Sequence, residues 1–222
     1  QRQMCIRDSH HTLRTEIEEQ GFAPNWRGHS DTEILLAGFV AWGVAATLQR
    51  VVGMFSFALW DKKERRLTLG RDRFGEKPLY YGWVGKGNSL SFIFGSELKS
   101  LRVFPNFHNQ VNRDALALYF KFSTVPAPYS IYQDIFKLEP GHILVLEPEG
   151  FYQKSIQIEP YWQLTDVIEN SASNLIIDDV EAVELLDSVL RESVQQQSVA
   201  DVPLGAFLSG GVDSSLITAL ML

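Results

Sequence analysis

One stretch constrains this chain more than any other, S-G-G-V-D-S-S at residues 209–215. It follows an apolar run at 202–208, which predicts a short buried strand, and precedes an apolar segment at 216–220, which predicts a helix. Adjacent glycines let a backbone turn tightly and approach a ligand without interference from Cβ atoms. The N–H groups that open a helix have no intrahelical acceptor and lie at the positive end of its dipole. The stretch therefore favours binding of an anion, most commonly a phosphate.

The stretch differs from a Walker loop, which requires G-x-x-x-x-G-K-[ST] and its lysine. No lysine lies between residues 202 and 220. Three serine hydroxyls would add hydrogen-bond donors, and Asp213 could hold a magnesium ion that bridges phosphate oxygens. The structural alternative is a helix N-cap behind a tight turn, with no ligand at all.

Composition narrows the class of protein. The 222 residues are enough for one or two domains, and 45% hydrophobic with 21% charged residues is ordinary for a globular protein. A net charge of −7 provides no basic surface, so nucleic acid is not an expected partner. The single cysteine fits a reducing compartment. The longest uncharged apolar run, 34–46, is shorter than the ~20 residues of a membrane span. We expect a soluble cytoplasmic protein without a membrane segment.

Residues 1–9 match nothing that follows, and we interpret them as a foreign leader. Residues 10–20 have apolar positions four apart and predict a short amphipathic helix that Gly21 ends.

A second helix is predicted to begin at Ser30 or Asp31 and to continue through residue 46, with breaks at its glycines, Gly38 and Gly43. Glu33 is placed to close a capping box onto Ser30.

The middle of the chain predicts an antiparallel sheet, because short aromatic runs alternate with turn signals. The first run, 53–61, is dense enough in apolar residues for a strand buried on both faces. A charged hairpin turn is expected at 62–66. Further strands are expected at 67–72, 79–84, 89–95 and 143–146, helical segments at 96–101, 112–120 and 180–194, and a linker or exposed loop at 170–179.

Four strings, taken together, point to a family. They are H-S-D-T-E at 29–33, G-M-F-S-F-A-L-W-D at 53–61, R-D-R-F-G-E-K-P-L-Y-Y at 71–81 and D-V-P-L-G-A-F-L-S-G-G-V-D-S-S at 201–215. In this order and at these distances they resemble glutamine-hydrolysing asparagine synthetase of the bacterial type. The resemblance runs from about residue 13 to the last residue.

The resemblance implies a mixed α/β and α+β protein with two domains. The first would be a class II glutamine amidotransferase domain, a four-layer αββα sandwich of the N-terminal-nucleophile type. The second would be an α/β ATP-pyrophosphatase domain, in which ATP activates aspartate as an acyl-adenylate that ammonia from glutamine attacks. The family suggests a homodimer, with ATP and magnesium as the required nucleotide and metal.

The resemblance also implies roles for individual residues. Asp31 matches the aspartate that binds the α-amino group of glutamine, which is reasonable because a carboxylate pairs with an ammonium. Residues matching the ATP and pyrophosphate site are Leu208, Ser209, Gly210, Gly211, Val212, Asp213, Ser214 and Ser215.

The chain departs from the family at its start. The family begins Met-Cys-Gly-Ile, and its cysteine is the nucleophile. Cys5 follows a methionine here, but Ile6 stands in the place of the glycine, and the segment between Cys5 and Asp31 is too short for the strings that supply glutamine-binding and oxyanion groups. We therefore reject Cys5 as a nucleophile and expect no catalytic residue in this chain.

The resemblance and these departures together predict an inactive fragment. It would have four parts: a leader at 1–9, a partial amidotransferase domain at 10–110, a connecting segment at 111–170 and the start of an ATP-binding domain at 171–222. Two alternatives stay open. One is a related amidotransferase with another acceptor, of the β-lactam synthetase or polysaccharide-cluster type. The other is a non-catalytic module that binds glutamine or nucleotide.

Overall fold

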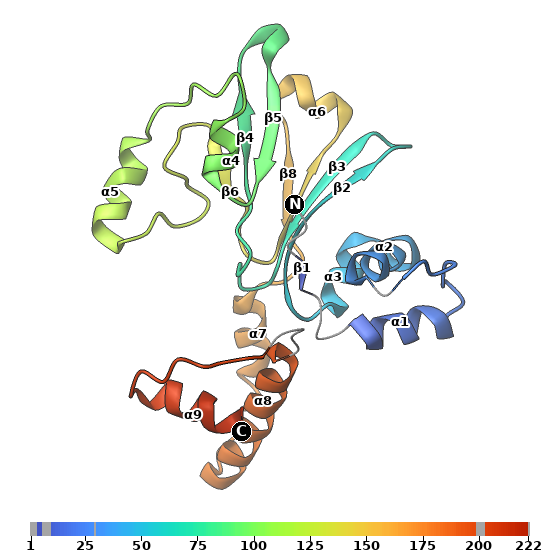
Figure 1. The fold of residues 1–222 in the computed structure, drawn as a ribbon, viewed down its shortest axis with the longest axis vertical. Helices are drawn as coiled ribbons and strands as arrows, with labels where there is room; N and C mark the ends of the chain where they lie inside the picture. Colours follow the sequence, from blue (N-terminus) through green and yellow to red (C-terminus); the bar gives the residue numbers. More distant parts are fainter. Residues whose placement is uncertain (1–3, 6–9, 29, 199–202, 222) are drawn as a thin grey trace. The chain divides into compact units, whose positions relative to one another are not determined.

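The computed structural model describes residues 4–5, 10–28, 30–198 and 203–221 (Figure 1). The chain divides into two compact units. The first is built around Met54–Gln163, and the second comprises Cys5–Gly53 and Leu164–Leu222. Each is described by itself. The expected leader lies mostly outside the described residues.

A five-stranded sheet forms one layer of the first unit, with the strand order β1-β2-β3-β7-β8. Its main strands pair antiparallel, and the expected hairpin at 62–66 joins the second strand to the third. In the register of these strands Leu69 lies opposite Leu144. The bounds are β1 Met4–Cys5, β2 Met54–Asp61, β3 Arg66–Arg71, β7 His142–Leu146 and β8 Gln157–Pro160.

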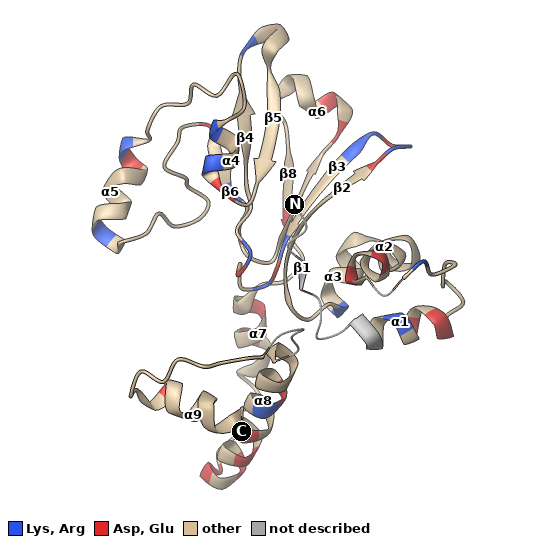
Figure 2. Ribbon diagram, viewed as in Figure 1, with Lys and Arg blue, Asp and Glu red and all other residues tan. Residues whose placement is uncertain are grey.

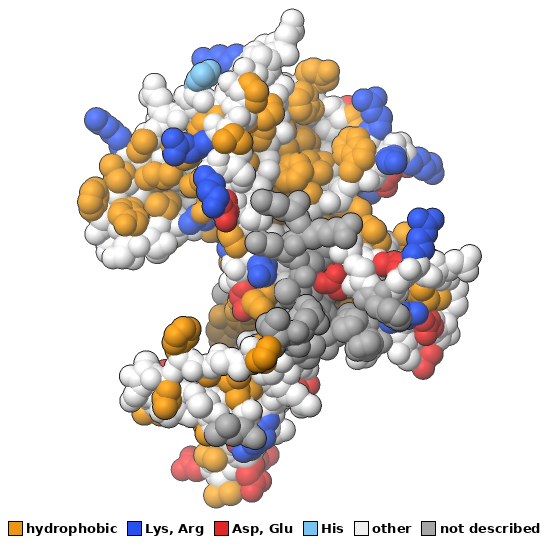
Figure 3. All heavy atoms as spheres, in the orientation of Figure 1, with side chains coloured by type: hydrophobic (Ala, Val, Ile, Leu, Met, Phe, Trp, Pro, Cys, Tyr) orange, Lys and Arg blue, Asp and Glu red, His pale blue; other side chains and the backbone are white. Residues whose placement is uncertain are grey.

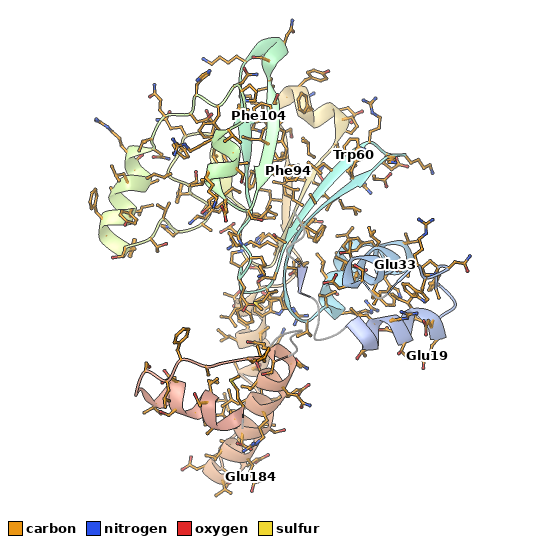
Figure 4. All side chains as sticks on the ribbon, viewed as in Figure 1. Glu19, Glu33, Trp60, Phe94, Phe104 and Glu184 are labelled. Atoms are coloured by element: carbon orange, nitrogen blue, oxygen red, sulfur yellow. The ribbon has the colours of Figure 1, made fainter. Side chains whose placement is uncertain are left out.

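Strand β2 is not buried on both faces, contrary to the expectation from its composition. Phe55 and Phe57 are buried, whereas Trp60 is 54% exposed on the same strand (Figure 4). The alternation shows that one face of the strand packs inward while the other is open, as is common in antiparallel sheets. Gly70, opposite Phe57, lets that ring cover the backbone, since a Cβ there would lie 2.3 Å from the ring.

A three-stranded sheet forms the second layer, with the order β5-β4-β6. It consists of β4 Tyr80–Val84, β5 Ser91–Gly95 and β6 Ile135–Lys137, and the short 3-10 helix η1 Gly87–Ser89 lies in the β4–β5 connection. The expectation of a connecting segment over 111–170 is wrong for residues 135–160. Strands β6 and β7 come from that range and pair with the earlier strands β4 and β3, while β8 pairs with β7. The range therefore belongs to the same two sheets.

The two sheets pack against each other through a shared apolar core. The five-stranded sheet contributes Leu69, Leu144 and Leu146, and the three-stranded sheet contributes Tyr81 and Trp83. The indole of Trp83 meets two rings edge-on, with centroids 5.0 and 5.2 Å away, which is favourable aromatic geometry.

Three helices accompany these sheets. A second buried cluster joins Ile93 and Ile135 to Leu101 of α4 Leu98–Arg102. Helix α5 Arg113–Phe122 begins as predicted at Asn112, whose side chain accepts hydrogen bonds from two backbone N–H groups. Helix α6 Pro148–Gln153 follows β7.

The loop after β3 is held by two adjacent charged residues. The guanidinium of Arg71 donates to the carbonyl oxygens of Gly75, Lys77 and Leu138. The buried carboxylate of Asp72 accepts from three backbone N–H groups, those of Phe55 at 3.3 Å, Glu76 at 2.8 Å and Lys77 at 2.9 Å. Buried charges of this kind persist because hydrogen bonds replace the lost water.

The second unit starts with three helices, α1 His10–Glu19, α2 Asp31–Trp42 and α3 Val44–Arg50. Gly21, at φ +75°, follows the first of them as predicted. Gly43, at φ +80°, separates α2 from α3, whereas Gly38 stays inside α2 and does not interrupt it. Gly38 instead permits close packing, because a Cβ there would lie 2.7 Å from Cγ2 of Thr47.

Its C-terminal part contains α7 Leu164–Ser171, α8 Asp179–Gln197 and α9 Val212–Leu220. Asp178 caps α8 by accepting from two backbone N–H groups. The expected linker at 170–179 is therefore confined to the residues between α7 and this cap. None of the helices in the described part of the chain combines the length and apolar character that a membrane span requires.

Candidate functional site

The candidate site residues fall in two places, the start of α2 and the start of α9. Asp31 is the first residue of α2 and is half-buried. Its Oδ1 accepts hydrogen bonds from the N–H of Thr32 at 2.7 Å and from the Thr32 hydroxyl at 3.3 Å. Its other oxygen, Oδ2, has no hydrogen-bond partner among the described residues. One carboxylate oxygen is thus fixed by the helix start, and one is available to a ligand.

Glu33 does not form the expected capping box. Ser30 is the N-cap residue, but its side chain makes no capping hydrogen bond. The carboxylate of Glu33 (Figure 4) instead accepts from the N–H groups of Arg27 at 2.8 Å and Gly28 at 3.1 Å. It reaches past the cap because the preceding loop presents two backbone donors to one carboxylate. Glu33 therefore fixes the segment that leads into Asp31.

The expected strand at 202–208 is not found in the described part of that run. Residues 203–208 have no regular structure and pair with no strand among the described residues, and Phe207 is 99% exposed. A strand needs a neighbour for its backbone groups, so an apolar run alone does not produce one. Residues 201 and 202 lie outside the described residues.

The glycine loop and the helix after it are confirmed. Gly210 has φ +82°, a conformation that favours glycine, and Gly211 is the N-cap of α9. That helix begins at Val212. Its opening N–H groups, up to that of Ser214, have no hydrogen-bond acceptor among the described residues. They are consequently available to an anion.

The serine hydroxyls are less available as donors to a ligand than the sequence suggests. Ser214 and Ser215 both donate to the carbonyl oxygen of Gly211, at 3.0 and 2.8 Å, and the Ser209 and Ser214 hydroxyl oxygens lie 3.0 Å apart. These bonds stabilise the turn and place the hydroxyls beside the helix start. The N–H groups remain as the principal donors.

The positive charge around this loop comes from the backbone N–H groups and the helix dipole. Residues 203–221 contain no lysine or arginine, and the carboxylate of Asp213 has no hydrogen-bond partner among the described residues (Figure 2). An anion would be held here by the helix dipole and the N–H groups. The side chain of Cys5 and all of His29 lie outside what the structure describes, so the rejection of Cys5 stays a prediction.

Comparison with known proteins finds family matches that cover both candidate sites. The glutamine amidotransferase domain family matches residues 9–162, more than half of the chain. The chain belongs to this family. The amidotransferase match extends past residue 110 and ends just after β8, the last strand of the five-stranded sheet. The asparagine synthase family matches residues 185–222, which include α9 and its loop.

Three curated relatives illustrate what the chain is similar to. Two glutamine-hydrolysing asparagine synthetases of Bacillus subtilis, numbered 3 and 1, are 34% and 33% identical to it, each over 94% of the chain and over 31% and 30% of their own lengths. A protein of Gibberella zeae named amidase chry2 is 31% identical over 87% of the chain and 27% of its own length. The chain spans about a third of the length of the curated asparagine synthetases that it matches.

Proposed function

We propose that this chain is part of a glutamine-dependent asparagine synthetase. The whole enzyme would hydrolyse glutamine to ammonia and use it to amidate aspartate that ATP has activated as an adenylate, yielding asparagine, AMP and pyrophosphate. The observation that carries the proposal is the start of α9, where Gly210 has φ +82° and the opening N–H groups have no acceptor among the described residues. Such a helix start suits a phosphate chain. The family matches support it at both ends of the chain.

We assign the pyrophosphate end of ATP to residues 208–215. The residues present fit a magnesium ion, since the Asp213 carboxylate has no competing partner in the described part of the chain. Magnesium commonly binds one or two carboxylates together with substrate phosphates. When bound, the ion would neutralise phosphate charge. We assign the α-ammonium of glutamine to Asp31, whose Oδ2 is unoccupied by any described donor.

The architecture that accompanies this function is a four-layer αββα sandwich followed by an α/β ATP-pyrophosphatase domain. The two facing sheets support the inner layers of that sandwich. Residues 1–9 would be a foreign leader, and the ATP-binding part would begin near residue 171. We place the enzyme in the cytoplasm as a homodimer. Because Ile6 follows Cys5, we expect this chain alone to form no glutamate from glutamine.

The test uses the longer protein that contains this chain. Release of pyrophosphate from ATP should depend on both glutamine and aspartate, and asparagine should form. Gly210→Val should abolish pyrophosphate release, because valine is strained at a positive φ and its side chain would crowd the N–H groups. Gly205→Val is the matched control, since Gly205 has open space around its Cβ position and no positive φ. Full activity of Gly210→Val would contradict the proposal.

A second candidate is an amidotransferase of the same family with a different acceptor. The similarity to a relative with a different name, amidase chry2, supports this candidate. Replacing aspartate by other carboxylic acids in the pyrophosphate assay separates the two. Glutamine-dependent pyrophosphate release with another acid, and none with aspartate, would establish the second candidate.

A further inference from the structure

An apolar cavity of about 510 Å³ lies between α5 and the three-stranded sheet, outside the site already described. This size falls in the usual range of small-molecule sites. Its walls come from α4, α5, the segment after α5, and strands β4 and β6. Most lining side chains are apolar or aromatic, namely Leu98, Leu116, Val125, Ile131, Tyr80 and Tyr119.

Lys137 is the one charged residue among those that line this cavity. Its ammonium donates a hydrogen bond to the carbonyl oxygen of Val125 and lies 5.8 Å from the centroid of the Tyr80 ring. The ammonium carries three N–H donors, and no described carboxylate pairs with it. Two donors therefore remain for a ligand.

Within the described residues, the Lys137 ammonium has no ion-pair partner. Burial lowers the pKa of the Lys137 ammonium, and the nearby Arg71 guanidinium lowers it further. The carboxylate of Asp72 is engaged by three backbone N–H groups and forms no ion pair with Lys137. A partly buried cation without a counter-ion is stabilised when an anion enters beside it.

We propose that this cavity binds a small organic carboxylate with an apolar body. The carboxylate pairs with the Lys137 ammonium, and the body fills the space against Leu116 and Tyr119. Ser123 and Thr124 line the same cavity and are its polar uncharged residues. Apolar side chains are also exposed on the outer surface of α5, where Phe120 is 77% exposed (Figure 3).

The test compares two probes of nearly the same shape. The 222-residue chain is titrated with phenylacetate and with phenylacetamide, which lacks the charge, and binding is measured by calorimetry and by backbone amide shifts of α5. We expect phenylacetate to bind at least fivefold more tightly. Lys137→Met should bring the two probes to equal affinity, and Lys137→Arg should keep the preference. Lys121→Met is the control, because Lys121 lies on α5 over the Phe122 ring and does not line the cavity.

A second variant guards against a folding effect at Lys137. Leu116→Trp fills the cavity from the half-buried surface of α5 without altering the lysine, and it should abolish binding of both probes. Equal affinity of the native chain for the two probes overturns the proposal. So does phenylacetate binding that survives Leu116→Trp, or a preference for phenylacetate that survives Lys137→Met.

Discussion

The hydroxyl of Tyr161 donates a hydrogen bond of 3.0 Å to the backbone carbonyl oxygen of Arg71, joining the end of β8 to the end of β3. Both groups are buried. Tyr161→Phe leaves this carbonyl without its donor, so we expect a loss of about 1–2 kcal/mol in the free energy of unfolding. Urea denaturation followed by circular dichroism measures it. Tyr152→Phe is the matched control, since Tyr152 is 84% exposed, and an equal loss there would contradict the role of the bond.

Substitution of Asp72 should destabilise the first unit more than most single substitutions. Asp72→Asn removes a buried negative charge that accepts three backbone N–H bonds and replaces one oxygen by a donor. We expect the free energy of unfolding to fall by about 2–3 kcal/mol, since bonds to charged groups are stronger than neutral ones.

Asp61 offers a matched control for that substitution. Its carboxylate also accepts from two backbone N–H groups, those of Lys63 and Glu64, but in the exposed hairpin turn. Asp61→Asn should therefore lower the free energy of unfolding much less than Asp72→Asn. Similar losses at the two positions would show that burial of Asp72 contributes nothing.

Alkaline stability should depend on Tyr81. Burial raises the pKa of Tyr81 from 10.0 to about 12, and the Glu139 carboxylate adds to the rise. The folded state thus holds this proton where the unfolded state has released it. Its contribution to stability is complete below pH 10 and is lost as the pH rises toward 12. We expect the melting temperature to fall with pH in this window, and less steeply in Tyr81→Phe. Ultraviolet titration of the phenolate checks the assignment, and an identical slope in the variant would refute it.

Glu33 should control the order of the loop before α2. Glu33→Ala removes the acceptor of the Arg27 and Gly28 N–H groups, so hydrogen exchange at these two amides should accelerate by about tenfold for each 1.4 kcal/mol of lost protection. Glu64→Ala is the control, because the Glu64 carboxylate lies in the exposed hairpin turn, where its ion-pair partner is Lys63. Unchanged exchange at both amides would show that the carboxylate does not hold the loop.

Features with a local cause could be predicted from the sequence. Asn112 caps its helix because it needs only the N–H groups two and three residues ahead. The turn at Gly210 and the start of α9 follow from local chemistry in the same way.

Features that depend on distant partners could not be predicted from the sequence. The pairing of β3 with β7 joins segments with no shared pattern, so the strand expected at 143–146 could not be placed beside β3 from the sequence. The flanking strands β6 and β8 were not predicted. The Glu33 carboxylate could accept from Ser30, three residues back, or from Gly28 and Arg27, five and six residues back, and loop geometry decided between them. Lys137 gave no motif at all; its position under α5 emerges only from the packing of the second sheet.

The strand order has a consequence for how the protein is made. A ribosome releases β2 and β3 together as a hairpin, but the other neighbour of β3 is β7, which emerges after β4, β5, β6 and α5 have been synthesised. Until then the nascent chain presents an unpaired edge with apolar residues, a template for association with other chains. Slow translation between residues 72 and 142 should prolong that exposure.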